Sequence, residues 1–275
     1  MQTNYIKCGD NVQLMKTLPD ECIDLTVTSP PYDNLRKYNG FDWDLESVVN
    51  ELYRITKWGG VIVWVTNDAT IKGSESCSSF IHALTFKSIG FNLHDTMIWY
   101  KDSFSLPDTT RYGQCFEYMF VFSKGKPKNI HLICDRKNKY AGQQIHGTNR
   151  LPNGTTVRKS NDKKSIVKNV GVRFNVWEIP TEKHNISGHP AVFPEKLATD
   201  HILTWSNEGE IVLDPFCGSG TTCLCAIKNK RQYIGFDISQ DYCNMANKRL
   251  FSERIFAEGW DCWGNEAPEN NKEEV

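Results

Sequence analysis

Short apolar runs that stop at turn-forming or acidic residues alternate with amphipathic stretches along most of this chain. The apolar runs lie at 5–8, 23–27, 61–65, 96–100, 118–122, 176–180, 210–214 and 233–237. Apolar residues at helical spacing occupy 11–18, 45–57, 78–89, 194–205, 223–228 and 241–253. Strands that alternate with helices predict an α/β fold with a doubly wound, mostly parallel sheet. Gly59-Gly60 is expected to end the helix over 45–57.

One long segment interrupts this alternation. Periodicity is weak from 129 to 175, where Gly and Asn are frequent, and this is typical of an insertion. The residues after 257 are rich in Glu and show little periodicity. We therefore predict that 1–123 and 176–256 form the two halves of one domain, with an inserted recognition region at 124–175. An acidic, flexible tail is expected at 257–275.

The net charge of −1 conceals an uneven distribution. Between Lys124 and Arg173, 13 Lys or Arg residues accompany only Asp135 and Asp162, so this segment carries +11 and the remainder −12. A concentrated positive charge favours a polyanionic partner such as nucleic acid. A solvated, lysine-rich loop is the alternative interpretation.

Composition limits the remaining possibilities. No apolar run approaches the roughly 20 residues that cross a bilayer, and residues 1–5 lack the basic and apolar parts of a signal peptide. We expect a cytoplasmic protein without a membrane partner, which would be associated with the nucleoid if its polyanionic partner is DNA. The ten cysteines include no C-x-x-C pair, so buried thiols are expected rather than a disulfide framework or a metal site.

The first candidate motif is Ser29-Pro30-Pro31-Tyr32, which follows the apolar run 23–27. Two prolines end a strand because neither can donate to a sheet ladder, and they force an extended exit. That exit would place Ser29 and an aromatic ring at the carboxyl edge of the sheet, where α/β proteins bind ligands. A simple strand stop with Tyr32 in the core is the alternative.

The second candidate motif follows the run 210–214 and reads Asp214-Pro215-Phe216-Cys217-Gly218-Ser219-Gly220-Thr221-Thr222. Glycines let backbone approach a ligand, and the helix that begins after them offers free N–H groups to an anion. Asp214 could receive an ammonium group, whereas Asp237 ends the next strand and could accept both hydroxyls of a ribose. Capping of a strand exit is the alternative role for Asp237. A ligand with an amino acid end and a nucleoside end fits this set, and S-adenosylmethionine is such a ligand.

With these motifs in this order, the chain resembles the DNA amino-methyltransferases that methylate N4 of cytosine or N6 of adenine, in their β-type arrangement. The resemblance covers most of 5–250 and implies a permuted, Rossmann-like methyltransferase fold with a basic target-recognition insert. It implies that Ser29, Pro30, Pro31 and Tyr32 are catalytic. It also implies a cofactor site that includes Asp10, Asp214, Phe216, Gly218, Ser219, Gly220, Thr221 and Asp237.

The resemblance implies a mechanism that these residues can perform. Tyr32 would stack on a flipped base, while Ser29 and the Pro30 carbonyl accept hydrogen bonds from the exocyclic amine and so orient its lone pair. Ser at position 29 favours cytosine, because Asp is common there in adenine enzymes of the family. Phe193 stands where many members have Lys, so the helix start at Gly220-Thr221 is expected to take more of the cofactor carboxylate.

Several assignments remain open from the sequence. Duplex DNA is the expected partner, with Arg36 and Lys37 in a possible lid over 33–44 and further contacts from Arg136, Lys139, Arg150, Arg158 and Arg173. A second copy of the chain and a cognate restriction endonuclease are partners that the sequence leaves open. The favoured function is a sequence-specific, S-adenosylmethionine-dependent N4-cytosine methyltransferase. The alternatives are an N6-adenine enzyme, an RNA or protein methyltransferase, and an inactive DNA-binding protein.

Overall fold

The computed structural model describes residues 1–31, 43–102, 110–145, 147–158, 166–181 and 194–257. Two compact units are present, the larger comprising Met1–His131 with Asn175–Val275 and the smaller comprising Leu132–Phe174. Each is described by itself below. No described helix is long and apolar enough to cross a membrane.

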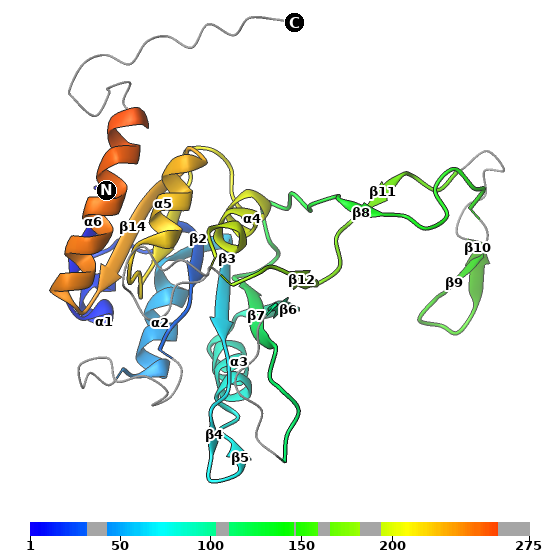
Figure 1. The fold of residues 1–275 in the computed structure, drawn as a ribbon, viewed down its shortest axis with the longest axis horizontal. Coiled ribbons are helices and arrows are strands. Elements are labelled where there is room, and N and C mark those ends of the chain that lie inside the picture. The colour runs from blue at the N-terminus through cyan, green and yellow to red at the C-terminus, as the bar shows by residue number, and fades with distance from the viewer. Residues whose placement is uncertain (32–42, 103–109, 146, 159–165, 182–193, 258–275) are drawn as a thin grey trace, which may run out of the picture. The chain divides into compact units, whose positions relative to one another are not determined.

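The larger unit is built on an eight-stranded sheet in the order β1-β14-β13-β2-β3-β7-β6-β12 (Figure 1). Only β7 runs against the other strands of this sheet, so the sheet is mostly parallel as predicted. Its strands are β1 Tyr5–Cys8, β2 Ile23–Thr28, β3 Thr56–Thr66, β6 Asn92–Tyr100, β7 Phe116–Ser123, β12 Val176–Glu178, β13 Ile211–Asp214 and β14 Gln232–Asp237. A separate hairpin joins β4 Thr70–Ile71 to β5 Ser74–Glu75.

Helices cover both faces of this sheet, with α1, α2 and α3 on one face and α4, α5 and α6 on the other (Figure 1). They are α1 Asn11–Met15, α2 Leu45–Ile55, α3 Ser78–Ile89, α4 Glu195–Trp205, α5 Thr221–Lys228 and α6 Gln240–Ala257. The core on the α1–α3 face packs helix residues such as Leu52 and Phe86 against Ile62, Trp64 and Phe122 of the sheet. Burial on both faces explains why the middle of β3 is apolar at every position.

The order of strands shows that the fold is permuted, as the sequence indicated. β13 and β14, which come late in the chain, lie between β1 and β2, which come first. The chain therefore inserts its last βαβ unit between its first two strands. This placement brings the two sequence motifs to neighbouring strands.

The predicted end of α2 was wrong. The helix ends at Ile55 and the chain is already extended at Thr56, so Gly59-Gly60 lies inside β3. The sheet register jumps here, from Ile23 opposite Thr56 to Leu25 opposite Val61. A Cβ on Gly60 would lie 2.7 Å from Cγ2 of Thr56, so the glycine is needed for this irregular entry into the strand. Helix α1 is also shorter than predicted, because two hydrogen bonds to residues three positions earlier close its last turn.

The smaller unit contains two short antiparallel ribbons, which lie in a region that the sequence left without periodicity. They pair β8 Arg136–Lys137 with β11 Val170–Gly171, and β9 Thr148–Arg150 with β10 Thr156–Arg158. Its role as a target-recognition region stays a prediction.

Candidate active site at a reversal of strand order

The candidate site lies at the carboxyl ends of β13 and β2, which are neighbours in the sheet. From β13 the chain continues through α5 to β14 on one side, whereas β2 leads through α2 to β3 on the other. Ligands of open α/β sheets bind in the crevice where the strand order reverses in this way. The two sequence motifs therefore meet at the expected ligand edge.

Two buried hydrogen bonds join the motifs directly. The hydroxyl of Thr28, the last residue of β2, donates to Oδ1 of Asp214 at 2.7 Å. The hydroxyl of Thr222, in the first turn of α5, donates to the carbonyl of Val27 at 3.0 Å. No role was predicted for either threonine, although Thr28 stands beside Ser29 and Thr222 is the last residue of the second motif. These bonds fix the strand that carries Ser29 to the turn that follows Asp214.

Asp214 is a buried carboxyl group, with only 2% of the residue exposed. Burial raises its pKa to about 6, against the hydrogen bonds from the Thr28 hydroxyl and the Phe216 amide, and the nearby Asp237 raises it further. A positive group at this edge would favour the ionised form. The residue is thus suited to receive a cation, and its assignment to the cofactor stays a prediction.

Asp237 ends β14 and holds the glycine turn by its side chain. Its Oδ2 accepts from the Gly218 amide at 2.9 Å and its Oδ1 accepts from the Ser239 amide at 2.8 Å. Burial raises the pKa of this carboxyl group, while the two backbone hydrogen bonds oppose that rise. Each carboxylate oxygen keeps a second lone pair. Asp237 therefore caps the turn and can still accept a pair of ligand hydroxyls, so the two roles considered from the sequence are compatible.

The two glycines of the turn have different purposes. Both adopt positive φ, 49° at Gly218 and 79° at Gly220. A Cβ on Gly220 would lie 2.9 Å from Cβ of Ala246, so this glycine allows α6 to pack against the turn. Gly220 is the N-cap of α5 and offers no side-chain acceptor, so no described side chain caps the first-turn N–H groups of this helix.

Cys223 occupies the third glycine position of a dinucleotide fingerprint, and Gly235 makes room for it. A Cβ on Gly235 would lie 2.9 Å from Sγ of Cys223. Close packing of helix and strand is thus achieved with the small residue on β14 instead of α5. Burial raises the pKa of the Cys223 thiol well above its usual value, so the thiol is an inert part of the core.

A network of ion pairs between α4, α5 and α6 holds the glycine turn, and the sequence did not reveal it. Arg249 of α6 donates to the Thr221 hydroxyl at 2.9 Å and to the Ser219 carbonyl at 3.3 Å. Its other terminal nitrogen lies 2.7 Å from Glu195 of α4, which also pairs with Lys228 of α5 at 3.0 Å. Burial would raise the pKa of Glu195, but the two cationic partners hold it below its usual value. Three helices are thereby tied together behind the motif.

Aromatic rings cluster beside Phe216. Trp43 meets Phe216 edge-on with ring centroids 5.2 Å apart, and it lies 5.8 Å from His82. His82 Nδ1 lies 3.1 Å from Nε1 of Trp64, which therefore donates to it. Side chains from four separate segments meet here, so no local sequence pattern could have identified the cluster.

The structure describes only part of the predicted catalytic motif. Ser29 is half-buried at the end of β2, Pro30 is buried and Pro31 is half-buried. Tyr32, the lid residues Arg36 and Lys37, and Phe193 lie outside the described residues. Their roles stay predictions.

Asp10 lies at the same edge as Asp237, because Cys8 of β1 is paired with Asp237 of β14 and the Gly9 amide donates to the Asp237 carbonyl at 2.9 Å. Its Oδ1 accepts from the Gln13 amide at 2.8 Å and so caps α1. The predicted contact with the cofactor is thus consistent with its position. Asp68, which follows the end of β3, instead accepts hydrogen bonds from the amide and hydroxyl of Ser79 in the first turn of α3.

The basic residues predicted to bind DNA from the smaller unit are not equivalent. Arg173 pairs with Asp135, with Nε 3.0 Å from Oδ2, and Arg136 donates to the Val172 carbonyl while its guanidinium lies 4.4 Å from the Phe174 ring. Lys139 lies over the ring of Tyr140. By contrast, Arg150 and Arg158 are exposed on the ribbon formed by β9 and β10.

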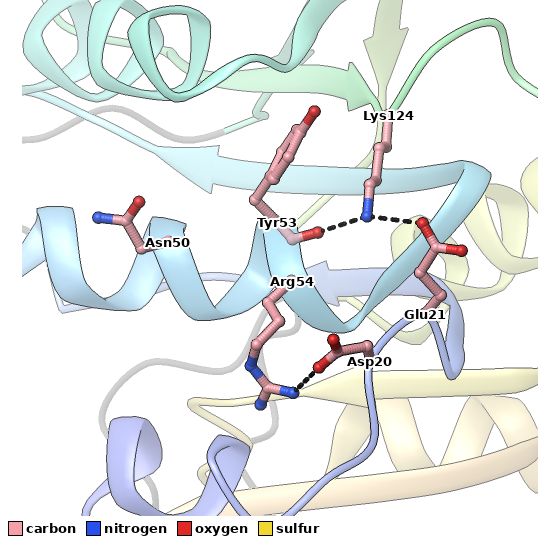
Figure 2. A pocket seen from close by; sticks show the side chains of 6 residues that line it. All are labelled: Asp20, Glu21, Asn50, Tyr53, Arg54 and Lys124. Carbon is pink, nitrogen blue, oxygen red and sulfur yellow. Dashed lines mark hydrogen bonds and ion pairs between the residues drawn. The ribbon is translucent and has the colours of Figure 1, made fainter.

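A pocket of about 560 Å³ lies at the amino ends of β2 and β3, the edge opposite to the candidate site (Figure 2). Lys124 Nζ donates there to the Tyr53 carbonyl at 2.9 Å and pairs with Glu21 at 3.1 Å, while Arg54 pairs with Asp20 at 2.6 Å. Each of these charges already has a partner in the chain. We therefore assign a structural role to the residues that line this pocket, which hold α2 to the flanking loops.

Comparison with known proteins agrees with this geometry. Residues 23–248 match the sequence model of the N6/N4 DNA methylase family. The orphan methyltransferase M.BamHII of Bacillus amyloliquefaciens is 58% identical over 245 residues, which cover 86% of this chain and 92% of that protein. The DNA adenine methyltransferase YhdJ of Escherichia coli is 28% identical over 259 residues, which cover 88% of this chain and 81% of that protein.

Two solved structures show the same fold. The cytosine-N4-specific PvuII DNA methyltransferase superposes with a TM-score of 0.66 at 21% identity, covering 95% of both chains. Thermus thermophilus TTHA0409, in complex with S-adenosyl-L-methionine, superposes with a TM-score of 0.61 at 23% identity, covering 91% of this chain and 95% of that one. The fold is therefore the Rossmann-like methyltransferase fold expected from the sequence, and the chain belongs to the N6/N4 family of DNA methylases.

Proposed function

We propose that this DNA methyltransferase moves a methyl group from S-adenosylmethionine to the exocyclic N4 amine of a flipped cytosine in duplex DNA. The single observation that carries the proposal is the buried Thr28–Asp214 hydrogen bond, which fixes the Ser29 strand exit against the glycine turn. Methyl donor and acceptor need to be held in line, and this bond joins the two elements that would hold them.

The residues of the glycine turn fit the proposed cofactor. Asp237 offers two carboxylate oxygens, Asp214 a buried carboxyl group, and α5 its uncapped N-terminus. These match a ribose, a cationic group and a carboxylate respectively. When it is bound, S-adenosylmethionine supplies an electrophilic methyl group on a sulfonium ion.

The chain's own part in the reaction is to orient the amine. The Ser29 hydroxyl and the Pro30 carbonyl are both acceptors, and the prolines keep the strand exit stiff. Two acceptors on the N–H groups would direct the nitrogen lone pair toward the methyl group. After transfer the amine gives up one proton to water, so no covalent enzyme intermediate is needed.

The choice of cytosine rests on Ser29 alone. The named relatives include an adenine enzyme, and a structural neighbour specific for cytosine N4 is only 21% identical. N6-adenine methylation by the same site is therefore the second candidate. Both reactions would use the Ser29 hydroxyl and the Pro30 carbonyl as acceptors for the N–H groups of an aromatic amine.

Mass spectrometry of nucleosides distinguishes these functions. We expect N4-methylcytosine in duplex DNA treated with the protein and isotope-labelled cofactor. N6-methyladenine without N4-methylcytosine would contradict the base assignment, and label only in RNA or protein would contradict the substrate class. Ser29→Ala should lower kcat by roughly 10- to 1,000-fold with little change in cofactor affinity. Thr26→Val, on the same strand, is the matched control.

A further inference from the structure

The ribbon of β9 and β10 carries two arginines on the same face. Its register places Arg150 opposite Thr156, Asn149 opposite Val157 and Thr148 opposite Arg158. Opposed residues share a face of a ribbon, and residues two apart share it as well. One face therefore presents Arg150, Arg158 and two threonines, whereas Asn149 and Val157 occupy the other.

A well-formed turn holds this ribbon. The Leu151 amide donates to the Thr155 carbonyl at 2.7 Å, and the Gly154 amide donates to the Leu151 carbonyl at 2.9 Å. The Asn153 side chain accepts from the Thr155 amide and hydroxyl at 3.1 and 2.7 Å. Gly154 has a φ of +84°, a conformation that glycine adopts readily and that this turn uses. The two arginines are thus mounted on a defined element.

Neither arginine has a partner within the described part of the chain. Arg150 and Arg158 are exposed, and the described residues offer their guanidinium groups no hydrogen bond or ion pair, although both backbones pair within the ribbon. Arg173 and Arg136 of the same unit are engaged, the first by Asp135 and the second by the Val172 carbonyl and the Phe174 ring. The ribbon therefore holds two guanidinium groups that no described residue engages, in contrast to those of Arg136 and Arg173.

We propose that the ribbon of β9 and β10 enters the DNA major groove and that Arg150 and Arg158 read guanine bases through O6 and N7. The major groove admits a two-stranded ribbon, and a two-pronged contact from Arg to guanine is the commonest specific contact there. The threonines between the arginines add hydroxyl groups that can contact either kind of base pair. This inference rests on the proposed function, since it requires a duplex DNA substrate.

Substitutions that keep the charge test base reading against phosphate contact. Arg150→Lys and Arg158→Lys keep the positive charge but lose the planar fork. DNA methylated by the wild-type protein and by each variant is sequenced to find the target. We expect the wild-type target to contain G·C pairs. Each variant should lose discrimination at one of those pairs by about 5- to 150-fold, with methylation of other sequences retained. Lys137→Gln removes an exposed charge from the other ribbon of the same unit and should leave the target unchanged.

A base analogue gives a second, independent readout. Replacing the guanine read by Arg150 with 7-deazaguanine removes the N7 acceptor. We expect this to lower kcat/KM of the wild-type protein about 5- to 150-fold and to have little further effect on Arg150→Lys. Equal losses in both proteins would show that Arg150 makes no contact with that base and would overturn its assignment.

The remaining outcomes separate this proposal from the proposed function. Unchanged target sequences in both arginine variants, or equal losses on all sequences, would overturn base reading while the enzyme remains a DNA methyltransferase. A target without G·C pairs would also overturn it. If the wild-type protein methylates no duplex DNA, the proposed function fails first and the ribbon proposal falls with it. Cofactor affinity measured by calorimetry should be the same in every variant.

Discussion

Asp214 is the residue at which the two halves of the candidate site converge. It receives a hydrogen bond from the catalytic strand and stands at the start of the glycine turn. Its folded pKa of about 6 exceeds its ordinary value of 3.8, so the folded protein holds a proton that the unfolded chain has already lost between these pH values. Stability of the free protein should therefore fall as pH rises through this window, by about 3 kcal/mol at most.

Cofactor affinity should show the opposite pH dependence. A bound cation next to Asp214 favours the carboxylate, so the Kd for S-adenosylmethionine should decrease as pH rises from 5 to 7, by up to about tenfold per unit below the pKa. Calorimetry across this range measures the effect. Asp214→Asn should weaken binding and flatten the profile. Asp237→Asn separates the contribution of the second carboxyl group, whose pKa burial also raises. A wild-type profile without slope would contradict the ammonium role.

Thr28 and Thr26 on the same strand provide a matched pair. Thr28→Val removes a buried donor to Asp214, and it should lower the free energy of unfolding by roughly 1–3 kcal/mol and raise the pH midpoint of cofactor binding. Thr26 is also buried, but its hydroxyl has no hydrogen-bond partner among the described residues. Thr26→Val should be neutral or stabilising. Denaturant titration of both variants tests this, and equal losses would mean that the Thr28 bond has no special role.

At the scale of elements, the site depends on how closely helices approach the turn after β13. The sequence indicated that glycine was needed there, and the structure shows that the two glycines have different roles. Gly218 donates its amide to Asp237, whereas Gly220 leaves space for Ala246 of α6. Arg249 of the same helix then holds Ser219 and Thr221. Helix α6 is therefore part of the support of the cofactor turn.

Gly220→Ala should reveal this support. The new Cβ would be strained at a φ of +79° and would lie 2.9 Å from Ala246, so we expect a loss of roughly 2–5 kcal/mol in unfolding free energy and weaker cofactor binding. Gly209→Ala is the control, because Gly209 has a φ of +80° with no atom near its Cβ. It should lose only about 1–2 kcal/mol. Similar losses in the two variants would remove the packing argument.

At the scale of the whole molecule, the basic segment is not uniform. Lys124 contributes to the charge count of that segment, but only 7% of the residue is exposed. Its Nζ donates to the Tyr53 carbonyl and pairs with Glu21 (Figure 2). It also donates to the Thr56 carbonyl. Lys137, in the smaller unit, is exposed, and its side chain makes no hydrogen bond or ion pair with the described residues. Equal charges in the sequence thus have different roles.

Salt dependence of DNA binding should separate these lysines. Lys137→Gln should reduce the slope of log affinity against log salt by up to about 1 without changing stability, because an exposed cation can release one counterion from DNA. Lys124→Met should leave that slope unchanged but lower the free energy of unfolding by roughly 1–3 kcal/mol. Fluorescence anisotropy over a salt series, together with denaturant titration, measures both effects. A reduced slope for Lys124→Met would contradict its structural role.

The sequence by itself determined the strands of the main sheet, its helices, the family and the two motifs, because hydrophobic periodicity, glycine turns and proline stops act over a few residues. Helix α3 and strand β1 even begin and end where the pattern placed them. Local signals were insufficient at Gly59-Gly60, where a helix terminator and an irregular strand entry use the same glycines.

Only the tertiary structure decided which distant residues meet. The Thr28–Asp214 hydrogen bond joins residues 186 positions apart. Arg249 of α6 donates to Glu195 of α4, and Arg173 pairs with Asp135. No periodicity encodes such partners, because each depends on how strands and helices pack after the chain has folded. The sequence therefore identified the chemistry at this sheet edge, and packing decided which side chains hold it in place and which charges remain available.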